Sequence, residues 1–153
     1  MKKFLFTLPL FIVIAFCATE SQAQSNWEVG MRFGDNTSID MTVPIGAEPR
    51  LHAAVYLDKF GVGAYFDWMY SLSGGPTGLK FYPGIGPEVF FEDQFKLAAA
   101  GDFGAEYSFN FPLTIGVDWR PALDLTNDVD FRTGNWGFIA RFRFGEGTSF
   151  VKD

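Results

Sequence analysis

The chain has 153 residues, a net charge of −6 from 12 basic and 18 acidic residues, and a hydrophobic content of 48%. An acidic chain does not offer the basic surface that nucleic acids bind, so we expect no nucleic-acid partner. Its single cysteine, Cys17, excludes an internal disulfide and a thiolate metal site.

Residues 1–23 predict a cleaved signal peptide. Lys2 and Lys3 supply a charged start, an apolar stretch follows, and Ala23 closes a small-residue cleavage site. A membrane anchor is the alternative, but the apolar stretch is shorter than the ~20 residues of a spanning helix. We therefore expect export and a mature start at Gln24.

Apolar and polar residues then alternate along most of the chain. A period of two indicates strands with one apolar and one polar face. In chain order the pattern predicts eight strands, at residues 27–34, 38–43, 51–58, 61–70, 79–91, 95–109, 113–120 and 136–144. The longest exceeds the ~5–6 residues usual in soluble domains and suffices for the ~9–11 tilted residues that cross a bilayer. The predicted fold is all-β: an eight-stranded antiparallel up-and-down transmembrane β-barrel over residues 24–144, with a short periplasmic tail at 145–153.

The fifth predicted strand, 79–91, contains Pro83 and Pro87. Each lacks the N–H group that a closed sheet uses, and the two are four residues apart, so both missing donors point toward the same neighbour. Gly84 and Gly86 lie between them and suggest a bulge. The pattern leaves open whether this strand is continuous.

Side-chain size predicts which face is inside. An eight-stranded barrel has an interior just wide enough for side chains to fill, and the apolar face carries most of the large aromatic residues, whereas the polar face is rich in glycine and alanine. The polar face is therefore the predicted interior. Its acids and bases can neutralise one another, as buried charges require. This interior charge network comprises Glu28, Arg32, Asp40, Lys80, Glu88, Lys96, Asp102, Glu106, Asp118, Arg120, Arg141 and Arg143.

The outer face would then meet outer-membrane lipid. The strand cores carry no charge on this face, and aromatic residues near strand ends are typical of interfacial girdles. The predicted girdle comprises Trp27, Tyr70, Tyr107, Trp119, Trp136 and Phe144.

With the N-terminus on the periplasmic side, the connections at 35–37, 59–60, 92–94 and 121–135 become extracellular. The last of these is long, polar and acidic, and is the only one with room for recognition. Its candidate recognition residues are Asp124, Asp128, Asp130 and Arg132.

Three stretches, residues 78–89, 104–121 and 140–144, resemble small outer-membrane β-barrel proteins of Bacteroidota-type bacteria. More distantly, the architecture is similar to that of the OmpX/OmpA-like eight-stranded barrels. The resemblance implies insertion by the barrel-assembly machinery and specifies a fold better than a function. One departure is the tail at 145–153, which follows the terminal aromatic residues Phe142 and Phe144.

Three constellations could carry chemistry. His52, the only histidine, lacks the His-x-Ser pattern of small lipid A deacylase barrels, so an interior hydrogen-bonded role is favoured. Glu106 and Asp118 could pair as glycosidase carboxylates, but nearby arginines favour salt bridges. The three loop aspartates match no complete calcium loop and favour a solvated acidic segment.

We therefore expect neither metal nor cofactor, and no catalysis, with a plugged polar interior and a structural or adhesive role in the cell envelope. The extracellular ligand cannot be named from the sequence. The alternatives are a narrow pore, a lipid A-modifying enzyme and a soluble periplasmic lipocalin-like binding barrel.

Overall fold

The computed structural model describes residues 27–91, 94–126 and 129–145. The predicted signal peptide, the predicted mature start at Gln24 and the predicted tail at 145–153, apart from Gly145, lie outside these residues. Within the described residues no helix is long and apolar enough to cross a membrane.

The described chain forms eleven strands in one sheet. Their bounds are β1 Trp27–Gly34, β2 Ser38–Pro44, β3 Pro49–Tyr56, β4 Gly61–Trp68, β5 Tyr70–Ser71, β6 Leu79–Phe90, β7 Lys96–Ser108, β8 Leu113–Trp119, β9 Ala122–Asp124, β10 Phe131–Arg132 and β11 Trp136–Phe144. The predicted strands agree with β1–β4, β6–β8 and β11 to within a few residues.

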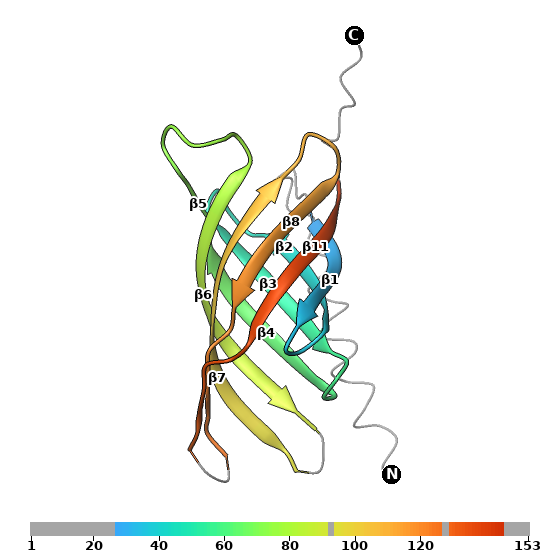
Figure 1. Cartoon of the computed structure of the whole chain (residues 1–153), viewed down its shortest axis with the longest axis vertical. Coiled ribbons are helices and arrows are strands. Elements are labelled where there is room, and N and C mark those ends of the chain that lie inside the picture. The colour runs from blue at the N-terminus through green and yellow to red at the C-terminus, as the bar shows by residue number, and fades with distance from the viewer. Residues whose placement is uncertain (1–26, 92–93, 127–128, 146–153) are drawn as a thin grey trace.

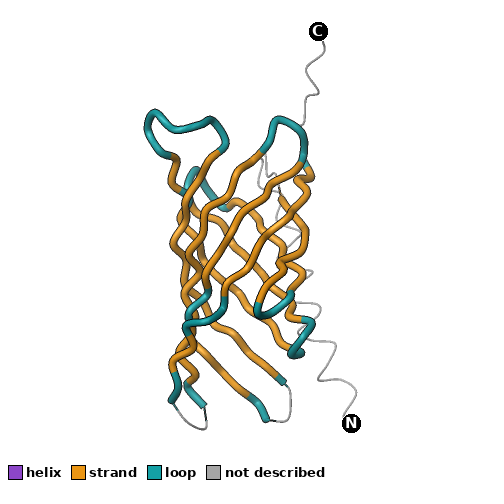
Figure 2. Tube along the Cα trace, viewed as in Figure 1, coloured by secondary structure: helices purple, strands orange, loops and turns teal. Residues whose placement is uncertain are grey.

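These eight longer strands close into an antiparallel barrel (Figure 1). Each pairs with the next of them along the chain, and β11 closes the cylinder on β1. This last ladder covers the whole length of β1, from Trp27 opposite Phe144 to Gly34 opposite Gly137. The predicted closed, eight-stranded antiparallel β-barrel is confirmed. The strands run obliquely to the long axis, and loops gather at the two ends (Figure 2).

The two ends of the barrel differ. We call the end where β1 begins and β11 finishes the terminal end, and the opposite end the far end. At the far end the β6–β7 hairpin and the β9–β10 hairpin reach well beyond the β1–β2 and β3–β4 turns (Figure 1).

Strand β6 is continuous through both of its prolines. It pairs with β7 at every position from Leu79 to Phe90, while its ladder with β4 is interrupted where Pro87 and Gly86 face Ala64 and Tyr65. Pro87 lies within this gap, and Pro83 lies just past the last β4 pair, Asp67 with Gly84, so both missing N–H groups fall where the β4 ladder has no pair. This resolves the question that the sequence left open.

The predicted recognition loop, 121–135, is not a free loop. Strand β9 continues β8 in the same register against β7, with Trp119 opposite Phe103 and Ala122 opposite Ala100. Strand β10 folds back on β9. Between β10 and β11 the residues 133–135 oppose only residues 120–121, which is the geometry of a bulge.

Polar side chains fill the barrel, and large apolar side chains cover it. Interior glycines make room for the largest inward groups: a Cβ on Gly104 would overlap the Tyr82 ring, and one on Gly137 would overlap the Arg32 guanidinium. On the outside Phe138 and Phe142 remain 46% and 56% exposed. Arg120 and Arg141, by contrast, are completely buried inside.

Candidate functional site: the buried ionic interior

One continuous ionic network runs through the barrel. It links six carboxylates, four guanidinium groups and one imidazole by ion pairs, and every member is buried. The members are Glu28, Arg32, Asp40, Arg50, His52, Asp67, Asp102, Glu106, Asp118, Arg120 and Arg141. Because they come from β1–β4, β7, β8 and β11 and the segment after β8, the network ties together strands far apart in sequence.

At the terminal end the network begins with Glu28 and Glu106. Arg141 Nε donates to Glu28 at 3.0 Å, and its Nη2 donates to Glu106. Arg50 Nη1 contacts both Glu106 oxygens at 2.9 Å, and Arg50 Nε reaches Asp67 at 2.9 Å. Glu28, Arg50 and Glu106 also line a cavity of about 460 Å³ that lies within the terminal mouth.

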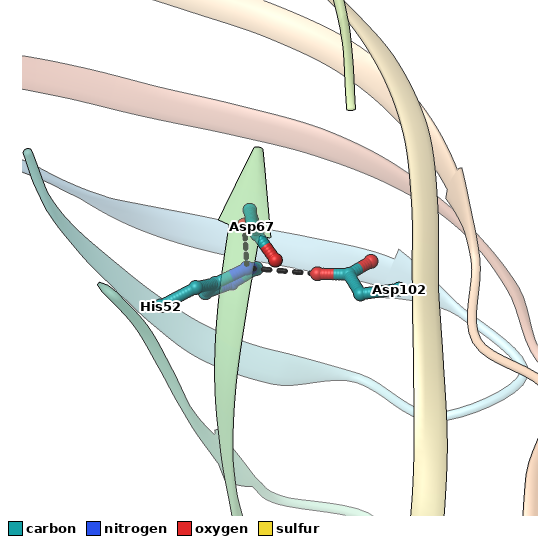
Figure 3. A group of neighbouring side chains, drawn as sticks. All are labelled: His52, Asp67 and Asp102. Carbon is teal, nitrogen blue, oxygen red and sulfur yellow. Dashed lines mark hydrogen bonds and ion pairs between the residues drawn. The ribbon is translucent and has the colours of Figure 1, made fainter. Parts of the chain in front are cut away.

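At the centre His52 lies among three aspartates. Its Nε2 is 2.9 Å from Asp40 Oδ2, and its Nδ1 is 3.2 Å from Asp67 Oδ2 and 2.9 Å from Asp102 Oδ2. Figure 3 shows the imidazole edge pointing at the Asp67 and Asp102 carboxylates, which come from β4 and β7. His52 and these three acids are all at most 1% exposed, so protein groups make their contacts.

Arg120 joins the centre to the far end. Its Nη2 is 2.7 Å from Asp40 and 3.0 Å from Asp118, and its Nε is 3.3 Å from Asp102. Asp118 also accepts from Arg32 Nε at 2.7 Å. Arg32 then donates to the carbonyls of Asn36 and Asn135, which fastens the bulge before β11 to the barrel.

A second cluster closes the far end. Tyr56 and Tyr65 donate to Glu88 at 2.8 and 2.6 Å, and Arg132 Nη2 lies 3.1 Å from the other Glu88 oxygen. Arg132 also pairs with Asp124 at 2.9 Å. Although burial disfavours its charge, the Glu88 and Asp124 carboxylates raise the pKa of the Arg132 guanidinium above its ordinary value.

Three predicted network residues lie elsewhere. Lys96 is exposed at the start of β7, so it is not an interior residue. Lys80 is half-buried opposite Glu106, without an ion pair to any described residue. Arg143 donates to the carbonyls of Phe109 and Phe111 and so holds the β7–β8 turn rather than an acid.

The remaining predicted network residues do lie inside, but the sequence reasoning missed several partners. Arg50 was missed because it follows Pro49 and lies just before the predicted strand at 51–58. It nevertheless lies two residues from His52 in β3, so both side chains point to the same face. Asp67 was placed on the polar face but not in the network. The inward tyrosines Tyr56, Tyr65 and Tyr82 were also left out, and their alternation with outward residues was the signal available.

The predicted girdle residues lie on the outer face at the two ends. The rings of Trp27 and Phe144 stack with their centroids 4.6 Å apart, where β1 begins and β11 ends. The rings of Trp119 and Trp136 stack with their centroids 5.7 Å apart, where β8 ends and β11 begins. Tyr70 and Tyr107 flank β6 near the terminal end.

The four predicted recognition residues differ in their location and exposure. Asp124 and Arg132 are half-buried strand residues that pair with each other, and Asp130 is exposed. Asp128 lies outside the described residues. The structure therefore corrects the expectation of a solvated acidic segment for Asp124, because its carboxylate is held in the far-end cluster.

No family model, curated protein or solved structure matches this chain.

Proposed function

We propose that the protein is an integral outer-membrane barrel, an up-and-down transmembrane cylinder with a plugged polar interior, and that its role in the envelope is structural or adhesive. The observation that carries the proposal is the inversion of polarity across the barrel wall. Ionised side chains pair inside, where water is excluded, while aromatic and aliphatic side chains cover the outside.

The apolar composition of the outer surface supports the proposal that lipid surrounds the barrel. Soluble monomers rarely expose contiguous apolar patches beyond a few hundred Å², whereas here exposed Phe, Trp, Val, Ile and Leu side chains recur on every long strand. A soluble lipocalin-like barrel would have the opposite arrangement, with apolar side chains inside. The stacked aromatic pairs at both ends suit the two membrane interfaces.

The interior supports a plug rather than a pore. The charged network and the tyrosine–Glu88–Arg132 cluster follow each other along the barrel axis. All their members are buried except Arg132, which is half-buried. The cavity at the terminal mouth ends on Arg50 and Glu106. An adhesive role would use the far-end hairpins, which would face outward from the cell if the terminal end is periplasmic.

Cell fractionation followed by a heat-modifiability gel tests the membrane assignment. We expect the protein in the detergent-extracted outer-membrane fraction and a faster-migrating band for the unboiled sample. Release as a folded species without detergent would overturn the proposal.

Two further assays separate the alternatives. In planar bilayers we expect no stable single-channel openings, and stable openings would indicate a pore. Incubation with lipopolysaccharide should leave its acyl chains unchanged by mass spectrometry, and a lost or added chain would indicate a lipid A-modifying enzyme.

A further inference from the structure

We propose that His52, Asp67 and Asp102 form a binding site for a divalent first-row transition metal ion such as Zn²⁺ inside the barrel. The three side chains come from β3, β4 and β7, and one ligand atom from each lies within 4.8 Å of the others. No spacing in the sequence indicates the site, because closure of the sheet is what brings the strands together.

The distances between the ligand atoms match those around a metal ion. His52 Nδ1 is 2.9 Å from Asp102 Oδ2 and 3.2 Å from Asp67 Oδ2. Nitrogen and oxygen ligands at about 2.1 Å from Zn²⁺ lie about 3.0 Å apart at a right angle and about 3.4 Å apart at the tetrahedral angle. The imidazole nitrogen therefore already lies at the separation of an adjacent ligand from each aspartate oxygen, and the ligand atoms of the two aspartates lie within 4.8 Å of each other.

Hydrogen bonding within the protein leaves this cluster incomplete. His52 Nδ1 has one hydrogen for two carboxylates. Its geometry is that of a hydrogen bond to Asp67, and Asp102 Oδ2 is left with an ion-pair contact to the same nitrogen at 2.9 Å. Asp102 Oδ2 and Asp67 Oδ1 are buried without a hydrogen-bond partner among the described residues. A buried carboxylate oxygen in this state is costly, and an ion bound between the three groups would coordinate the Asp102 oxygen that the imidazole proton leaves unpaired.

The surrounding groups fit the outer shell of a metal site. Metal-bound histidines usually donate their second ring N–H to a carboxylate, and His52 Nε2 lies 2.9 Å from Asp40 Oδ2. Arg120 approaches Asp102 through its other oxygen, Oδ1, and so orients this carboxylate from behind. Arg50 Nε donates to Asp67 Oδ2, the oxygen that faces His52, and so fixes the position of that ligand atom.

The donor set selects the kind of ion. Imidazole favours Zn²⁺ and other transition metals over Ca²⁺ and Mg²⁺, which prefer oxygen ligands alone. The charge also favours a cation, because three carboxylates surround the imidazole and each of the two nearby guanidinium groups is shared with a further acid, Glu106 or Asp118. Because all three ligands are buried, we expect the ion to be bound as the barrel folds and to exchange slowly.

Metal retention by the full chain tests the proposal. The protein is refolded into detergent with Zn²⁺ or Co²⁺, passed through a desalting column with EDTA, and analysed for metal content and, with Co²⁺, for visible absorption. His52→Gln and Asp102→Asn are the test variants. Glu28→Gln is the matched control, because it alters a carboxylate of the same network that does not face the site. Heat modifiability verifies folding of each sample.

We expect about one ion per wild-type and Glu28→Gln chain, a Co²⁺ absorption band in both, and background metal in the two test variants. Background metal in folded wild-type protein would overturn the proposal. Equal retention by wild type and both test variants would do so as well. If a test variant does not fold, the wild-type metal content and Co²⁺ spectrum still decide.

Discussion

Truncation of Glu106 tests the energetic importance of the buried network. This side chain is 4% exposed and accepts from Arg50 and Arg141, both at most 4% exposed. Removing one partner of a buried ion pair costs about 3–5 kcal/mol, because the other charge remains buried. After Glu106→Ala, Arg50 keeps Asp67 at 2.9 Å and Arg141 keeps Glu28 at 3.0 Å. Neither guanidinium is left wholly unpaired, so we expect a loss near the lower limit, about 3 kcal/mol.

The assay is urea unfolding in phospholipid vesicles, followed by tryptophan fluorescence. Ser108→Ala is the control, since Ser108 is the next inward residue on β7, lines the same cavity and donates or accepts one hydrogen bond, with Thr114. Its loss should cost about 1 kcal/mol or less. The double variant Glu106→Ala/Arg141→Met should lose less unfolding free energy than the two single variants lose together, by about 0.5–3 kcal/mol. A Glu106→Ala midpoint equal to that of Ser108→Ala, or strict additivity, would refute the reasoning.

Two further substitutions probe the outer and inner faces. Met31→Arg places a cation on the outer face, midway between the two aromatic girdles, and should destabilise the vesicle-bound protein by about 2–4 kcal/mol. The control Phe131→Arg, in the far-end extension, should have little effect on stability. Equal urea midpoints for the two variants would argue against a lipid-facing Met31. Gly104→Ala should cost about 1–3 kcal/mol because its Cβ would overlap the Tyr82 ring. Combining it with Tyr82→Val should recover part of that loss relative to Tyr82→Val alone, and no recovery would mean that the ring is not the obstacle.

The strands were predictable from sequence because alternation is a local property. It also gave the side of the wall on which each residue lies, including the inward positions of His52 and Asp102. The pairing inside the barrel was not predictable, since it depends on how far each strand is staggered against its neighbours. Arg50 and Glu106 are 56 residues apart and meet only across the closed barrel.

The far end was the least predictable region. Residues 122–124 and 131–132 are strands too short for a period to be recognised, and Pro121 masks the continuation of β8. Lys96 shares the parity of interior residues but lies beyond the enclosed part of the barrel. The odd or even position of a residue in its strand therefore predicts whether the side chain points into or out of the barrel, but not where the residue lies along the barrel axis.

The position of the tryptophans tests the central claim most directly. All four, Trp27, Trp68, Trp119 and Trp136, lie on the outer face, and Trp136 is 58% exposed. In vesicles of brominated phospholipid, the fluorescence of the wild-type protein should be strongly quenched relative to vesicles of unbrominated lipid, because bromine atoms on the acyl chains would touch these rings. Unquenched fluorescence from folded protein would contradict the account, since the aromatic surface would then face something other than lipid.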